Sequence, residues 1–194
     1  MVIANYPDER QEFFEKYMSP RNKEYAKMHG YEYLEYKDNL ALVRNNPTWW
    51  KFSVVRDLID SNTIKENDII SHFDADMCIT KPEYEFTTNK SFTYVIDSGN
   101  THCMGCYSMR INEWSKNTID MILDEKRYQK QIDVKSKHEF FGYTNSFIEE
   151  FREQAAWYYL AGIKRHSDIP FWDLENFGWH SSKDEFTYFS LDDL

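Results

Sequence analysis

Two acidic residues, Asp74 and Asp76, follow directly on the strand-like run 68–73 and flank Ala75. Residues i and i+2 of an extended chain point to the same side, so both carboxylates can reach one hard cation. Such a cation can bridge two phosphate groups. Aspartate is also common in turns, and the alternative is a solvated connection after the strand. The spacing therefore predicts a divalent-cation site at Asp74 and Asp76, with Ala75 in the same ligand-binding turn.

Lys51 is predicted on the apolar face of a helix at 49–59. At helical spacing it lies within a narrow arc of Val54, Val55 and Leu58, which is an unusual place for an ammonium group. The first turn of a helix disfavours a cation unless an anion is close by, so Lys51 is a candidate phosphate ligand. The alternative is a lysine whose charged end reaches past the edge of the core.

Glu153 and Gln154 point toward apolar neighbours on a helix predicted at 146–160. A buried carboxylate must be paired or have a perturbed pKa, which suits a general base or a ligand of hydroxyl groups. The alternative is a structural salt bridge to Arg110 or Arg152. The residues alone favour that alternative.

Strand-like and helix-like segments alternate along the chain, which indicates an α/β sheet with parallel members. The 194 residues, 41% of them hydrophobic, suffice for one sizeable core, so we expect a single domain over residues 1–194, alone or within a longer polypeptide. The expected strands are 2–6, 31–36, 68–73, 92–96 and 102–109, and the expected helices are 10–28 with a break at Ser19-Pro20, 49–59, 113–123 and 146–160. The acidic, aromatic stretch 168–194 is expected to be rich in loops. Sheets of this class bind ligands at the carboxyl ends of their strands, where Asp74 lies.

The net charge of −10 argues against a duplex nucleic-acid binder, because such proteins gather Lys and Arg to replace phosphate counter-ions. The three cysteines are an odd number at spacings that do not form a disulfide framework, and they indicate a reducing compartment. Cys103 and Cys106 are expected to be buried thiols. No apolar run approaches membrane-spanning length and no signal peptide is visible. We therefore expect a soluble cytoplasmic protein without its own membrane anchor.

Several blocks of the sequence together resemble a known enzyme family. They are Asn22-Lys23-x-Tyr25-Ala26-x-x-His29-Gly30-Tyr31, Trp50-Lys51 to Arg56-Asp57-Leu58, Asp74-Ala75-Asp76, Cys103 to Arg110 with Trp114, and Glu153-Gln154-Ala155-Ala156. Their order and spacing resemble the galactosyl- and xylosyltransferase family, which includes yeast Golgi mannan enzymes and plant xyloglucan enzymes. The compact length also resembles the amino-terminal domain of chlorella-virus capsid glycosyltransferases.

This resemblance implies a GT-A glycosyltransferase fold, with a mixed, mostly parallel central sheet flanked by helices. It implies transfer of a hexosyl or deoxyhexosyl group from a UDP-sugar to a glycan or glycoprotein acceptor, including a viral capsid glycan. The implied cofactor is Mn²⁺ or Mg²⁺, which stabilises the charge that develops on the departing diphosphate. For a viral protein the expected compartment becomes the host cytoplasm.

The same resemblance implies roles for residues that spacing alone does not single out. Asn5 and Tyr6 would receive the nucleotide base, and His180 would complete the metal site. Glu153 stands where the family commonly has Asp, which leaves both an inverting and a retaining reaction open. The candidate catalytic carboxylates are Glu153, Asp97 and Asp173, with Glu175 as a further one.

His72 is the rival of His180 as a metal ligand. It precedes Asp74 by two residues and so projects to the same side of the extended chain. Its position inside a strand favours a role in the core instead.

Two other classes of function stay open from the sequence. A metal-dependent phosphohydrolase would use the two aspartates to activate water and cleave nucleotide sugar. A non-catalytic, cation-dependent glycan-binding module would bind sugar without releasing UDP. The resemblance favours the transferase over both.

Overall fold

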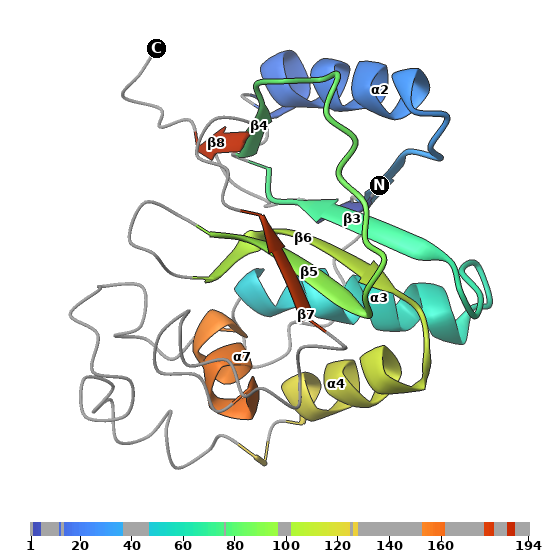
Figure 1. Ribbon diagram of the computed structural model, residues 1–194, viewed down its shortest axis with the longest axis vertical. Coiled ribbons are helices and arrows are strands. Elements are labelled where there is room, and N and C mark those ends of the chain that lie inside the picture. The colour runs from blue at the N-terminus through green and yellow to red at the C-terminus, as the bar shows by residue number, and fades with distance from the viewer. Residues whose placement is uncertain are drawn as a thin grey trace.

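The computed structural model has the alternating strands and helices that the sequence predicts (Figure 1). It describes residues 2–4, 12, 14–36, 47–75, 77–96, 102–124, 126–127, 153–161, 177–180 and 186–188. The strands are β1 (Val2–Ala4), β2 (Leu34–Tyr36), β3 (Ile69–Phe73), β4 (Met77–Ile79), β5 (Phe92–Ile96), β6 (His102–Arg110), β7 (Phe177–His180) and β8 (Phe186–Tyr188). The α-helices are α2 (Ser19–Met28), α3 (Trp50–Asp60), α4 (Glu113–Leu123) and α7 (Glu153–Ala161), with a π-helix at Phe14–Met18 and a 3-10 turn at Pro47–Trp49.

Six strands form one sheet in the order β2-β1-β3-β6-β5-β7, and β4 pairs antiparallel with β8 in a second, smaller sheet. In the large sheet, β1 pairs in parallel with β2 and β3, and β5 pairs in parallel with β7. The longest ladders are antiparallel, because β6 lies between β3 and β5 and runs opposite to both. The prediction of a mixed sheet is confirmed, and the prediction that it is mostly parallel is wrong.

The short connection between β5 and β6 explains the antiparallel centre. Parallel neighbours need a crossover of about a dozen residues or more, whereas antiparallel neighbours can be joined by a short turn. Only residues 97–101 separate these two strands, and Asp97-Ser98-Gly99-Asn100 is turn-like sequence that favours a hairpin. Because β6 reverses direction, β3 and β5 run the same way and end at the same edge of the sheet.

The stretch 168–194, which was expected to be rich in loops, contains two short strands among its described residues. β7 joins the large sheet beside β5, from Phe92↔Phe177 to Val95↔His180. β8 pairs with β4, and both late strands appear in red in Figure 1. Neither strand is longer than four residues, so their alternation is too short to be recognised in the sequence.

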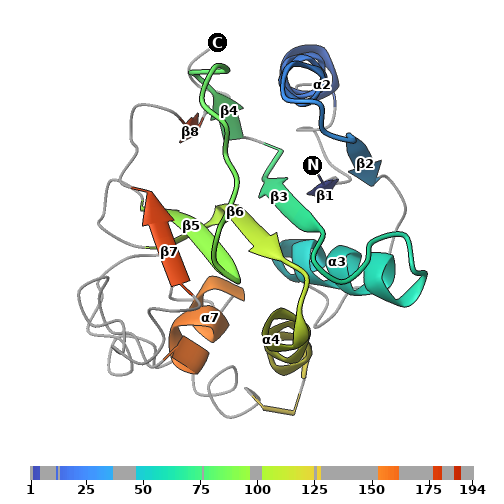
Figure 2. The ribbon, with the colours of Figure 1, turned by 45° about the vertical axis from the view of Figure 1, so that its right-hand side comes forward.

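Helices cover both faces of the large sheet (Figure 2). On one face α3, α4 and α7 pack around a core that includes Phe52, Met109 and Trp157. On the other face α2 packs around a second core that includes Tyr25 and Phe73. None of the described helices is long and apolar enough to span a bilayer.

Local chemistry sets the ends of these helices. At the start of α4, the Asn112 side chain accepts a hydrogen bond from the Ser115 amide, and the Ser115 hydroxyl accepts one from the Asn112 amide. The predicted break at Ser19-Pro20 is where the π-helix gives way to α2, and proline suits a first helical turn because its missing N–H is not needed there. After α2, Gly30 adopts a φ of 70°, which glycine reaches without strain.

Candidate functional site

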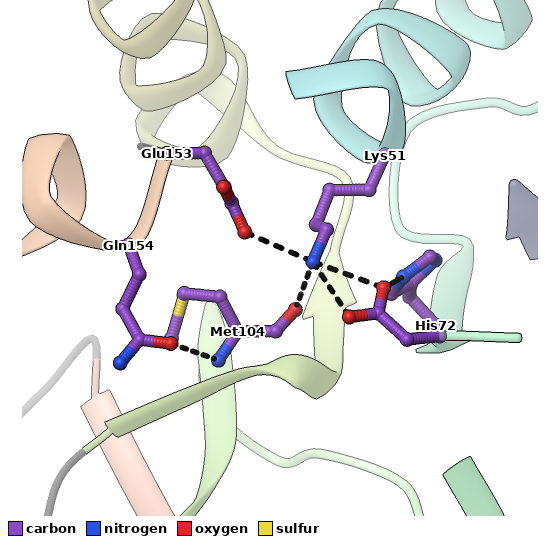
Figure 3. Close-up of polar contacts among 6 residues, drawn as sticks. Lys51, His72, Met104, Glu153 and Gln154 are labelled. Atoms are coloured by element: carbon purple, nitrogen blue, oxygen red, sulfur yellow. Dashed lines mark hydrogen bonds and ion pairs between the residues drawn. The ribbon is translucent and has the colours of Figure 1, made fainter. Parts of the chain in front are cut away.

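The Lys51 ammonium group lies at the centre of a buried charged cluster (Figure 3). Its Nζ is 2.9 and 3.0 Å from the two carboxylate oxygens of Asp74 and 3.0 Å from Glu153 Oε1, and it donates to the main-chain oxygen of Met104 at 3.1 Å. The exposed fraction of the side chain is 3% for Lys51, 7% for Glu153 and 14% for Asp74. A ligand that approaches the cluster therefore meets Asp74 first.

Three elements that are distant in the sequence meet at this cluster. Lys51 comes from the first turn of α3, on the apolar face where helical spacing predicts it. Asp74 follows β3 at the carboxyl edge of the sheet, and its amide donates to the Gly105 carbonyl at 2.7 Å, which fixes the chain as it leaves the strand. Glu153 is the first residue of α7. The sheet thus fixes the main chain at Asp74, and α3 and α7 place the side chains of Lys51 and Glu153 beside it.

A bulge in β6 brings main-chain groups into the cluster. Tyr94 pairs with Tyr107 but Val95 pairs with Cys103, so residues 104–106 are inserted relative to β5. The Met104 amide donates to Gln154 Oε1 at 3.4 Å while the Met104 carbonyl accepts from Lys51. The bulge therefore ties both α3 and α7 to the carboxyl edge of the sheet.

Asp74 is held in its charged form. Burial alone would raise the pKa of this carboxyl group, but the Lys51 ammonium and a hydrogen bond from His72 outweigh that effect and lower the pKa to about 2. A carboxylate in this state is a permanent anion at neutral pH. It is suited to attract a cation, or to accept hydrogen bonds from a ligand.

The ring of His72 is fully buried, which confirms that this residue belongs to the core. Its Nε2 lies 2.9 Å from Asp74 Oδ1, and the ring stacks on Tyr107 with centroids 5.0 Å apart. Tyr107 stacks in turn on Phe92, and Phe92 on Trp157 of α7. A column of aromatic rings thus runs across one face of the sheet, from Trp157 of α7 to the histidine that contacts Asp74.

Glu153 is paired, but not with Arg110, and the other predicted partner, Arg152, lies outside the described residues. The partner of Glu153 is Lys51, whereas the Arg110 guanidinium donates to the carbonyls of Thr88 and Asn67. The second oxygen, Glu153 Oε2, is buried and has no hydrogen-bond partner among the residues that the structure describes. Buried carboxylate oxygens nearly always have such partners, so Oε2 has capacity to accept a hydrogen bond from a ligand.

Several predicted site residues fall outside the described ranges. These are Asn5, Tyr6, Asp76, Asp97, Asp173 and Glu175. Ala75 is described and buried, directly after Asp74. The backbone of His180 is described in β7, opposite Val95, and its side chain is not. Since β7 runs parallel to β5, this strand also ends at the edge that carries Asp74.

The predicted metal site can be compared with the chemistry of the described side chains. Within those ranges no three His, Cys, Asp or Glu residues are grouped so as to hold a metal ion. Asp74 offers the anionic oxygens that a hard divalent cation prefers, so the donor that is described fits such an ion. The side chains of Asp76 and His180 would have to complete the set, and the metal stays a prediction.

Cys103 and Cys106 are buried thiols that are not joined in a disulfide, as the sequence predicts. Burial raises the pKa of the Cys106 thiol, with Cys103 and Asp74 adding to the effect. A neutral, enclosed thiol is unreactive, so this pair packs the bulge of β6.

The fold is similar to a crystal structure of a glycosyltransferase involved in the glycosylation of the major capsid of PBCV-1. The two share a TM-score of 0.56 and 10% sequence identity, over 93% of this chain and 80% of that one. No family model and no curated protein sequence matches the chain. The chain therefore has a glycosyltransferase-like fold, as the sequence resemblance implied. Membership of the galactosyl- and xylosyltransferase family stays a prediction.

Proposed function

We propose that this protein is a metal-dependent glycosyltransferase that moves a hexosyl or deoxyhexosyl group from a UDP-sugar to a glycan acceptor. The observation that carries the proposal is the ion-paired cluster of Lys51, Asp74 and Glu153 at the carboxyl edge of a glycosyltransferase-like sheet. This edge is where α/β sheets bind ligands. The acceptor class includes the glycans of a viral capsid protein, which is the process named for the structural neighbour.

In this proposal Asp74 and Asp76 hold Mn²⁺ or Mg²⁺ together with His180. The bound cation supplies positive charge to the diphosphate of the donor. Asn5 and Tyr6 receive the base, at the end of the strand next to β3. Lys51 holds Asp74 as an anion, and it would have to release one of its present partners to contact a phosphate oxygen.

Glu153 and Gln154 are proposed to serve the sugar side of the reaction. Glu153 Oε2 is buried with an unused acceptor position among the described contacts, and it can take a proton or a hydrogen bond from a hydroxyl group. If the reaction inverts the configuration, Glu153 is our first candidate for the base, ahead of Asp97 and Asp173. If the reaction retains it, the departing diphosphate can take the acceptor proton itself.

The direct test is thermal unfolding of the full chain with UDP, with Mn²⁺ and with both. A ligand that binds only the native state stabilises it by about 2.7 kcal/mol at a concentration 100 times its dissociation constant. We expect stabilisation by UDP only when Mn²⁺ is present, and its absence would refute the proposal. A panel of UDP-sugars measured in the same way would then identify the donor.

Turnover separates this function from the two other classes. A transferase releases UDP faster when its glycan acceptor is added. A phosphohydrolase cleaves the UDP-sugar at a rate that glycan does not change. A glycan-binding module releases no UDP, and its affinity for glycan falls in the Asp76→Asn variant.

A further inference from the structure

His72 contacts Asp74, whose carboxylate is 14% exposed and so is buried enough to be fixed by its neighbours while a ligand can still reach it. The Asp74 carboxylate forms an ion pair with Lys51, and an ionised carboxylate can only accept hydrogen bonds. At 2.9 Å the His72 Nε2 must therefore carry a proton and donate it to Asp74 Oδ1. A nitrogen that carries this proton has no lone pair for a metal ion. The other ring nitrogen, Nδ1, is buried, so neither nitrogen of His72 is placed to serve as the metal ligand that its spacing suggested.

The donors to Asp74 are distributed unequally over its two oxygens. Oδ1 accepts a hydrogen bond from the His72 imidazole at 2.9 Å and also lies 2.9 Å from the Lys51 ammonium in an ion pair. Oδ2 receives Lys51 at 3.0 Å. Within the described contacts Oδ1 therefore has two proton-bearing neighbours and Oδ2 has one, which leaves Oδ2 the more open of the two oxygens.

We propose that His72 is a positioning residue, which fixes the carboxylate of Asp74 so that Oδ2 faces the cation and the diphosphate. This inference rests on the proposed function. The imidazole can do this because its own ring is fixed, stacked on Tyr107 at 5.0 Å and fully buried. Without the N–H of His72, the Asp74 carboxylate can rotate about its side-chain bond while it keeps its ion pair with Lys51.

Three substitutions of His72 separate the hydrogen bond from the packing. His72→Phe keeps a ring in the aromatic column and removes the donor. His72→Gln removes the ring but puts an amide N–H near the place of Nε2, and His72→Asn has the same amide on a side chain that is too short to reach. His29→Phe is the matched control, since His29 contacts the Pro82 carbonyl at 2.7 Å outside the charged cluster.

The measurement is the affinity of the full chain for UDP in the presence of Mn²⁺, by titration calorimetry. Residues that orient a metal ligand typically contribute about 10–100-fold to affinity. We expect a loss of that size for His72→Phe and His72→Asn, and a value close to wild type for His72→Gln and for His29→Phe. Urea unfolding without ligand shows that each variant compared is folded.

Two results would overturn the inference while the proposed function stands. One is wild-type binding of UDP and Mn²⁺ by folded His72→Phe. The other is equal weakening in the Gln and Asn variants, which would mean that the ring and not the donor matters. If the wild-type chain itself does not bind UDP with Mn²⁺, the proposed function fails and this inference fails with it.

A spectroscopic readout needs no variant and no ligand. In the wild-type protein without metal, ¹⁵N NMR of the histidine rings should show a slowly exchanging proton on Nε2 of His72. A His72 Nε2 that carries no proton contradicts the donor role directly.

Discussion

Two buried polar centres in this molecule are built in opposite ways. Under α2, the Tyr25 hydroxyl donates to the Tyr84 carbonyl at 2.9 Å and accepts from the Phe86 amide at 2.7 Å, so a neutral group is satisfied on both sides. Between α3 and α7, Lys51 holds two carboxylates, and Glu153 Oε2 has no described partner. Burying charge costs more than burying a satisfied hydroxyl.

The difference indicates what each centre is for. The Tyr25 centre fastens residues 84–86 to α2 and has nothing left to offer a ligand. The Lys51 centre concentrates charge at the edge of the sheet and keeps acceptor positions open on Asp74 and Glu153. Buried charges and unsatisfied polar groups are expected more often at functional sites than elsewhere, which supports the second centre as the place of chemistry.

The largest effect is expected for Lys51→Met. It leaves two buried carboxylates without their counter-ion, and breaking a buried pair in this way typically costs about 3–5 kcal/mol. Urea unfolding should show a fall of that size in the free energy of unfolding, together with loss of UDP binding. The exposed Lys27 provides the control Lys27→Met, which should change neither quantity. A loss below about 1 kcal/mol for Lys51→Met would mean that the cluster is solvated like a surface pair.

Glu153→Gln should separate the binding of UDP from the transfer of the sugar. The amide oxygen can still accept from Lys51, so the protein should fold and bind UDP with Mn²⁺ as the wild type does. Without an ionised oxygen to take a proton, glycan transfer should slow by about 10²–10⁴-fold if Glu153 is the base. Steady-state release of UDP, with and without acceptor, measures this. Unchanged transfer would assign the base to another carboxylate.

Tyr25→Phe tests the neutral centre. It removes a hydroxyl that serves two main-chain groups, one of them the buried amide of Phe86. Leaving such a group unsatisfied typically costs about 1–3 kcal/mol. We expect this loss in urea unfolding and no change in the dissociation constant of UDP. If Tyr25→Phe instead lowers the affinity for UDP, the two centres act as one functional unit.

The smallest effect is expected for Tyr107→Phe. Like Tyr25→Phe it removes a tyrosine hydroxyl, but at the charged centre. The Tyr107 hydroxyl is buried without a hydrogen-bond partner in the described part of the chain, and burial raises its pKa, so it stays neutral. With no bond to lose, the free energy of unfolding should stay the same or rise by about 1 kcal/mol. A clear loss of stability would reveal a partner for this hydroxyl.

Much of the cluster could be predicted one residue at a time. Helical spacing predicted that Lys51 is buried, and alternation predicted that His72 and Asp74 face the same side. The sequence did not predict that Lys51 would contact both Asp74 and Glu153. These residues belong to three separate elements, and periodicity describes each element without saying which one lies next to it.

The errors in the fold have similarly specific causes. The antiparallel position of β6 was readable from the turn-like residues 97–100, because so short a link excludes a crossover. β7 was harder to foresee, since Phe177-Gly178-Trp179-His180 is a short run interrupted by glycine. Its place in the sheet depends on its pairing with β5, and no local sequence pattern predicts that pairing.

That pairing has a consequence for how the protein is made. β5 and β6 leave the ribosome long before β7, so in the nascent chain β5 is the open edge of the sheet. An unpaired edge strand is a template for association with other chains. A product that stops before residue 177 would carry this edge permanently, and we expect it to aggregate even if the rest of its core is intact. The pairing of β7 with β5 therefore protects this edge and prevents the sheet from associating with other chains.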